Sequence, residues 1–156
     1  MFAQAYDSPI GRIKLVSDGE AITQLCFDEN ASNQKTCPIL EKAKLWLDEY
    51  FALKKPTQTV ALKLSGTEFQ TKVWQIVQKI GYGESKSYIE IAEELARATG
   101  KLVSPRAVGR AVGANKIAIL IPCHRVLSSK TKLTGYAWGL DKKMALLNLE
   151  GVAYKS

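Results

Sequence analysis

Ile119-Leu120-Ile121-Pro122-Cys123-His124-Arg125-Val126 is the stretch on which our interpretation of the chain depends. Its first three residues are apolar, which predicts a short buried strand. Pro122 has no N–H and a fixed φ, so it would end that strand. Cys123 would then stand at a rigid position suited to a nucleophile, beside the only histidine of the protein. The alternative is that Cys123 is a small buried apolar residue and His124 a structural polar residue.

Composition predicts an ordinary globular protein. The chain has 156 residues, 46% of them hydrophobic and 24% charged, which suits one large core or two small ones. No apolar run has the length of a membrane span and no secretory signal is visible, so we expect a cytoplasmic protein. The three cysteines, Cys26, Cys37 and Cys123, show no disulfide spacing. With one histidine and no CxxC pair, we expect no metal and no cofactor.

Charge is distributed unevenly along the chain. Residues 1–64 hold eight basic and eight acidic side chains, so the whole net charge of +7 lies in residues 65–156. No Asp or Glu occurs between Glu94 and Asp141, whereas eight Lys or Arg do. A solvated basic face would explain such a run. Because the candidate nucleophile lies inside it, a polyanion partner, and nucleic acid in particular, is favoured.

Residues 1–64 predict an antiparallel sheet with one helix. Alternating apolar residues over Gly11–Ser17, the Asp18-Gly19 turn and the run Ala21–Phe27 indicate a hairpin. A polar loop covers residues 28–36. Pro38 then begins a helix with apolar residues at helical spacing. A further strand is expected from the alternation of Val60, Leu62 and Leu64.

Residues 65–156 predict short capped helices. Thr67 with Gln70 and Ser87 with Glu90 are capping-box pairs, and Ser104-Pro105 begins a third helix. Asp141 is expected to cap a last helix that carries Leu140, Met144 and Leu147 and ends at Gly151. The pair of helices after Ser87 and Ser104 has the outline of a helix-turn-helix unit, with Ala107, Val108, Ala111 and Val112 inside and Arg106 and Arg110 outside. We place the domain boundary between residues 64 and 65, where the charge also changes.

Here the sequence resembles the O6-alkylguanine-DNA alkyltransferases, or methylated-DNA–protein-cysteine methyltransferases. The resemblance covers Gly66 to Gly151 and, more weakly, Ser8-Pro9-Ile10-Gly11. Its most specific part is Pro122-Cys123-His124-Arg125-Val126. Further matching blocks are Gly66–Gln70, Val73-Trp74, Tyr82–Glu84, Ser87-Tyr88, Arg106–Gly109, Asn115, Gly135-Tyr136, Leu146-Leu147 and Glu150-Gly151.

The resemblance implies a DNA repair protein that flips an alkylguanine out of the duplex and moves the alkyl group to its own cysteine, Cys123. It implies that His124, oriented by Glu150, takes the thiol proton through a water, and that Tyr88 gives a proton to the departing guanine. Asn115 would hold the turn before the active site, and Arg106 would fill the gap left by the base. Tyr136 would help form the substrate pocket. Further DNA or substrate contacts would come from Ala107, Gly109, Arg110, Arg125 and Trp138.

The resemblance also implies a ribonuclease H-like α/β first domain and a winged-helix-like second domain. The partner would be double-stranded DNA that contains O6-alkylguanine, or O4-alkylthymine, bound by a monomer without strong sequence specificity. Without the family, Tyr88 and Tyr136 would be packing aromatics, Glu150 a helix-end acid and Arg106 a phosphate contact.

The chemistry agrees with these roles. Only a thiolate attacks carbon well, and an imidazole, helix N-termini and basic surroundings would favour an ionised Cys123. An extended chain would point the side chains of Cys123 and His124 to opposite faces, so their contact needs a turn or a bridging water. A guanine O6 inside the duplex cannot be reached without base flipping. The product thioether cannot be reversed by thiol exchange, so one molecule should repair one base.

Four features of the sequence depart from the family pattern. Lys116 replaces the usual proline after Asn115, which predicts a less rigid turn. Trp138 replaces a small residue and should disfavour large O6 substituents. Lys130-Thr131 replaces an expected glycine, and the loop 96–104 looks longer than usual.

Three other functions remain as alternatives. A non-catalytic binder of alkylated DNA would lack the reactive cysteine, which is present here. A transcription regulator would need a dimer or effector region and leaves the Pro-Cys-His-Arg motif unexplained. A cysteine hydrolase would have His124 as its only histidine.

Overall fold

The computed structural model describes residues 1–155, which divide into two compact units, Met1–Ser65 and a second unit that begins at Gly66. Within residues 1–155, no helix is both long and apolar enough to span a membrane.

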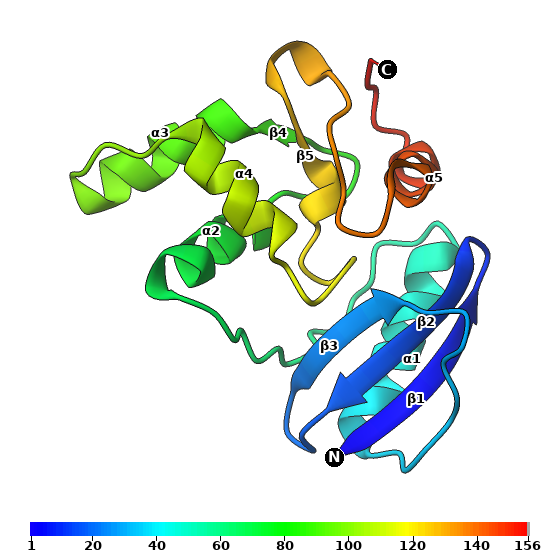
Figure 1. Cartoon of the computed structure of the whole chain (residues 1–156). Coiled ribbons are helices and arrows are strands. Elements are labelled where there is room, and N and C mark those ends of the chain that lie inside the picture. Colours follow the sequence, from blue (N-terminus) through cyan, green and yellow to red (C-terminus); the bar gives the residue numbers. More distant parts are fainter. Residues whose placement is uncertain (156) are drawn as a thin grey trace. The chain divides into compact units, whose positions relative to one another are not determined.

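The first unit is a three-stranded antiparallel sheet covered by one helix (Figure 1). The strands β1 (Phe2–Ser8), β2 (Gly11–Ser17) and β3 (Ile22–Phe27) pair in chain order. The predicted hairpin of β2 and β3 is confirmed, whereas β1 was not predicted. Helix α1 (Pro38–Phe51) buries one face against the sheet, through Leu40, Ala43, Leu47 and Tyr50.

The strand predicted from Val60, Leu62 and Leu64 is wrong. Only Leu62 forms a bridge, in parallel with Ile22. Ile22 donates to the carbonyl of Ala61 and accepts from Lys63, at 2.8 and 2.9 Å. Alternation alone cannot supply the pairing partners that a longer strand requires.

The second unit begins with three helices that pack on one another: α2 (Glu68–Gln78), α3 (Tyr88–Thr99) and α4 (Pro105–Gly113). Both predicted capping boxes are present, and the Ser104 side chain accepts from the N–H of Ala107, with Pro105 at the helix start. The Trp74 indole donates to the carbonyl of Ala111 at 2.8 Å and so ties α2 to α4. Residues 96–99 of the expected loop are helical, because α3 continues to Thr99 and Gly100 ends it in the left-handed conformation.

Short elements and a last helix complete this unit. A parallel pair joins β4 (Lys86–Ser87) to β5 (Val126–Leu127), preceded by the 3-10 turn η1 (Cys123–Arg125) and followed by η2 (Ser129–Thr131). Helix α5 (Leu140–Glu150) ends at Gly151, as predicted. Two predictions about α5 were wrong. Gly139, not Asp141, is its N-cap, and its buried residues are Lys143, Leu146, Leu147 and Glu150, with Leu140 exposed.

Candidate active site

Cys123 does not follow a strand. Residues 118–120 form a turn in which Leu120 donates to the carbonyl of Ala118 at 2.7 Å around Ile119, whose φ is +67°. A second tight turn follows at Pro122 (φ −78°, ψ 62°), where Cys123 donates to the carbonyl of Ile121 at 2.7 Å. These are γ-turns, the first of the strained positive-φ form. The predicted strand is therefore wrong, although Ile119 and Ile121 are fully buried as expected.

Asn115 holds this turn together. Its amide nitrogen donates to the carbonyls of Ile117 and Ile121, at 3.1 and 3.2 Å, and its oxygen accepts from the N–H of Ile117 at 2.9 Å. These three bonds take backbone groups that a strand would have paired with a neighbour. Lys116, which stands where the resemblance led us to expect proline, is exposed beside this turn.

His124 and Glu150 come together as the sequence predicted. Nε2 of His124 lies 2.6 Å from Oε2 of Glu150, and both side chains are fully buried. Burial lowers the pKa of His124, so its imidazole is neutral near pH 7. An ionised carboxylate can only accept, so Nε2 carries the proton and Nδ1 is left as an acceptor. Nδ1 is buried without a hydrogen-bond partner in residues 1–155.

Arg125 belongs to this buried group rather than to the protein surface. Its Nε and Nη2 donate to the two oxygens of Glu150 at 2.8 and 3.0 Å, and Nη1 donates to the carbonyl of Ile80 at 2.7 Å. The DNA contact expected of Arg125 does not fit this position. The sequence could not distinguish the two roles, because an arginine next to Cys123 and His124 can pair either with DNA or with a buried carboxylate.

Glu150 is consequently held as a carboxylate. Burial acts to raise its pKa, but hydrogen bonds from His124 and Arg125 outweigh burial and lower the pKa to about 2. The N–H of Gly83 adds a bond to Oε1 at 3.2 Å. The positive Arg125 balances the negative Glu150, so the imidazole is oriented by a nearly neutral pair.

Cys123 is a thiol rather than the ionised side chain that the sequence led us to expect. Its exposed fraction is 2%, and burial raises its pKa to about 12. Asn115 and Lys143 oppose this increase in the pKa but do not cancel it. The sulfur must therefore lose its proton to a base during reaction, and the neutral Nδ1 of His124 is an acceptor of the right kind.

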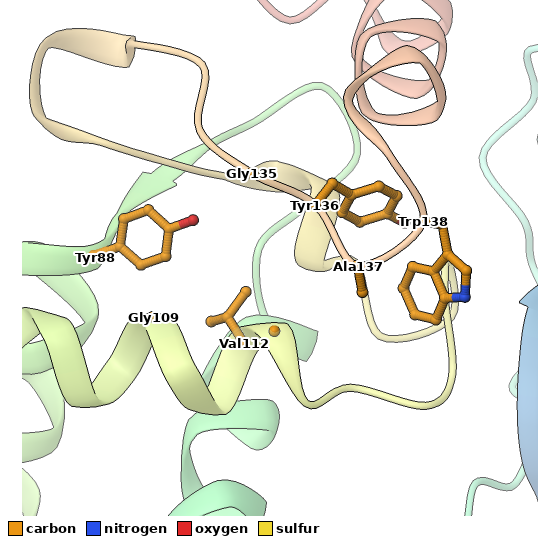
Figure 2. Close-up of a pocket in the computed structure, with 8 residues that line it drawn as sticks. Tyr88, Gly109, Val112, Gly135, Tyr136, Ala137 and Trp138 are labelled. Atoms are coloured by element: carbon orange, nitrogen blue, oxygen red, sulfur yellow. The ribbon is translucent and has the colours of Figure 1, made fainter.

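A pocket of about 380 Å³ lies next to this array and is of a size that suits a small ligand (Figure 2). Tyr88 stands on one side of it and Tyr136 and Trp138 on the other, with α4 below (Figure 2). Cys123 does not line the pocket, but an ionised Cys123 would act to raise the pKa of Tyr88 and of Tyr136, two residues of the pocket wall. The pocket is lined by Tyr88, Gly109, Val112, Gly113, Gly135, Tyr136, Ala137 and Trp138.

The remaining predicted residues lie around this pocket or on the outer face of α4. Gly109 forms part of the floor, and Trp138 packs edge-on against Tyr136, with ring centres 5.2 Å apart. Arg106 and Arg110 are exposed, whereas Ala107 is half-buried. The sequence did not point to Lys143 or Thr134. Lys143 could have been found from its helical spacing to Leu146, Leu147 and Glu150, which places it on the buried face of α5.

Comparison with known proteins identifies the family. Residues 1–64 match the family model for the "6-O-methylguanine DNA methyltransferase, ribonuclease-like domain". Residues 68–152 match the model for the "6-O-methylguanine DNA methyltransferase, DNA binding domain". The chain belongs to the 6-O-methylguanine DNA methyltransferase family.

Relatives in this family resemble the chain over nearly its whole length. The methylated-DNA–protein-cysteine methyltransferase of Haemophilus influenzae is 40% identical, covering 96% of this chain and 86% of the relative. The protein of the same name from Methanosarcina acetivorans is 40% identical, covering 97% and 99%. The crystal structure of Mycobacterium tuberculosis OGT in complex with DNA matches with a TM-score of 0.85 at 39% identity, covering 96% of this chain and 92% of that one.

Proposed function

We propose that this chain repairs DNA by moving an alkyl group, a methyl group in the simplest case, from O6 of guanine to Sγ of Cys123. The observation that carries the proposal is the buried array of Cys123, His124, Glu150 and Arg125 beside a pocket walled by two tyrosines. Methylated-DNA–protein-cysteine methyltransferase is the activity named for relatives about 40% identical over nearly the whole chain. The DNA complex of a similar structure supports DNA as the partner.

The reaction follows from the charge states of the site. The thiol proton of Cys123 passes to Nδ1 of His124, directly or through a water, and the imidazolium is stabilised by Glu150. The sulfur then forms a bond to the alkyl carbon as the bond from that carbon to O6 breaks. Guanine, leaving as an anion, takes a proton from Tyr88. Tyr88 regains a proton from solvent as the imidazolium of His124 releases to solvent the proton it took from the thiol, so no net proton is gained or lost. The thioether is stable, so each molecule reacts once.

The partner we propose is double-stranded DNA with O6-alkylguanine, or O4-alkylthymine, flipped into the pocket and bound by a monomer. Arg106 and Arg110 on the exposed face of α4 would contact the DNA without strong sequence preference, with Arg106 filling the vacated stack. We further assign a ribonuclease H-like fold to the sheet unit and a winged-helix arrangement to the second unit. The α1-covered sheet and the α3–α4 pair support these labels.

The direct test is to incubate the protein with an oligonucleotide that contains O6-methylguanine and to determine its mass. We expect a gain of about one methylene, located on Cys123. Cys123→Ser should show no gain, whereas Cys26→Ser, a matched change at another free cysteine, should show the full gain. A wild-type protein that binds this DNA without any gain in mass would instead be a non-catalytic binder.

Two further variants separate chemistry from binding. His124→Ala should slow the transfer more than it weakens DNA binding, because the imidazole is buried. Arg106→Ala should do the reverse, because its side chain is exposed on α4. Equal effects of each variant on rate and on affinity would contradict these roles.

A further inference from the structure

Lys143 is a buried cation that the proposed reaction does not use. Its exposed fraction is 1%, near the start of α5, and no ion pair within residues 1–155 includes it. Its ammonium instead donates to the carbonyl of Val126 at 2.7 Å and to that of Gly135 at 3.3 Å. Burial lowers the pKa of Lys143 to about 8, so it remains mostly charged at neutral pH. A buried charge without a carboxylate is costly, which makes this position a candidate for function.

The third hydrogen-bond partner of this ammonium links it to the pocket. Nζ of Lys143 lies 3.4 Å from Oγ1 of Thr134, and that oxygen lies 2.8 Å from the hydroxyl of Tyr88. An ammonium can only donate, so its field turns the oxygen of Thr134 toward Lys143. The hydroxyl proton of Thr134 is then directed at the oxygen of Tyr88.

We infer that Thr134 and Lys143 are positioning residues for Tyr88, forming a chain of hydrogen bonds from Nζ of Lys143 through Oγ1 of Thr134 to Oη of Tyr88. This inference rests on the proposed function, in which Tyr88 supplies the proton that the departing guanine takes up. As the Tyr88 O–H bond breaks and the proton moves to guanine, negative charge develops on Oη. The Thr134 hydroxyl donates to that oxygen, and Lys143 holds Thr134 in the donating orientation.

The same series of hydrogen bonds also holds the pocket wall in place. Thr134 and Gly135 are consecutive, and Lys143 holds both, so the segment that carries Tyr136 is tied to α5 from inside. Burial raises the pKa of Tyr88, and the bond to Thr134 acts against that increase. Loss of the Thr134 hydroxyl should therefore make Tyr88 a poorer proton donor without changing the DNA-binding face of α4.

The test compares variants of Thr134 in the full chain. Thr134→Val keeps the shape but removes the hydroxyl, whereas Thr134→Ser keeps the hydroxyl. We expect Thr134→Val to slow single-turnover transfer from O6-methylguanine DNA on the order of tenfold while leaving DNA affinity unchanged, and Thr134→Ser to restore most of the rate. Thr71→Val, which removes a hydroxyl that bonds the carbonyl of Thr67 within α2, should react like the wild type.

A double-mutant cycle tests the link to Lys143. If Lys143 and Thr134 act together on Tyr88, the double variant Thr134→Val with Lys143→Met should be about as slow as the slower single variant. Lys142→Met, which removes the same charge from the neighbouring position of α5, provides the control for net charge. Additive effects, or a Thr134→Val protein as fast as the wild type, would overturn the inference.

The outcomes for the inference and for the proposed function are distinct. A wild-type protein that gains no alkyl group would overturn both. A wild-type protein that reacts, with Thr134→Val and Thr134→Ser equally slow, would overturn only the inference, because a general packing defect would then explain the loss.

Discussion

Glu150 determines the charge state of the active-site residues. It accepts from His124, from two nitrogens of Arg125 and from the N–H of Gly83, all in a place closed to water. Each donor favours the carboxylate, and the carboxylate in turn fixes the proton of His124 on Nε2. Nδ1 is the atom that takes the proton of Cys123, and its basicity is therefore set by Glu150, which lies 26 residues further along the chain.

We expect Glu150 to make the protein sensitive to acid. Its pKa is about 2 in the folded protein and 4.5 ordinarily, so its contribution to the free energy of unfolding is complete above pH 4.5 and is lost as the pH falls toward 2. That shift corresponds to about 3 kcal/mol. Denaturant unfolding at a series of pH values measures it.

Glu150→Gln provides the comparison. The variant should be less stable than the wild type at pH 7, because Arg125 loses its counter-charge, and the difference should become smaller below pH 4.5. A difference that does not change with pH would show that Glu150 is not an ionised partner in the fold.

Trp138 limits the width of the pocket. Its indole lines the cavity and packs on Tyr136, at a position where the resemblance led us to expect a small residue. Trp138→Ala should raise the rate of transfer from O6-benzylguanine DNA relative to O6-methylguanine DNA by about tenfold or more, since a bulky group then gains space. Single-turnover rates for both substrates measure the ratio. Leu140→Ala, outside the pocket, should leave the ratio unchanged, and an unchanged ratio in Trp138→Ala would contradict the role.

Among the short elements, η2 contains the most unusual backbone. Lys130 and Thr131 have φ of +64° and +59°, the left-handed region in which glycine is favoured. The family glycine expected here is absent, but the chain still adopts the conformation that glycine would allow. The turn is held by hydrogen bonds of Ser128 to Lys132 and of Lys155 to Thr131, at 3.0 and 2.8 Å.

Replacing Lys130 with glycine should therefore stabilise the protein. Lys130→Gly removes the left-handed strain and should raise the free energy of unfolding by about 0.5–1 kcal/mol. Lys132→Gly, a matched change where φ is −75°, should lower it by about 0.5–1 kcal/mol. Thermal or denaturant unfolding measures both. The same sign of effect for the two variants would show that Lys130 is not strained.

At the scale of the whole molecule, the net positive charge comes from the second part of the chain. The sequence through residue 64 is neutral, and the excess of seven positive charges lies in the remainder, which includes the exposed Arg106 and Arg110 of α4. This distribution suits a DNA-binding second unit joined to a first unit without net charge.

DNA binding should accordingly weaken steeply with salt. Because each phosphate contact adds about −0.9 to the slope of log K against log salt, Arg106→Ala with Arg110→Ala should reduce the slope by up to about 2. Lys42→Ala with Lys54→Ala removes the same charge from exposed positions of the first unit and should change the slope little. Titrations of undamaged duplex DNA at several salt concentrations measure the slopes. Equal changes in both double variants would contradict binding through α4.

Elements whose causes are local could be predicted from the amino-acid sequence. The capping boxes at Thr67 and Ser87, the Ser104 cap and the Gly151 helix end depend on residues within a few positions of one another. The motif around Cys123, together with its wider register, also identified the family and paired His124 with Glu150.

The backbone conformation that presents Cys123, and the charge state of its sulfur, depend on contacts between distant parts of the fold. An apolar run such as residues 119–121 is equally compatible with a strand or with a buried turn, and the bonds from Asn115 decide between them. The buried partners of Arg125 and Lys143 come from distant segments of the chain. Desolvation is a property of the assembled fold, so no local pattern could have shown that Cys123 rests as a thiol.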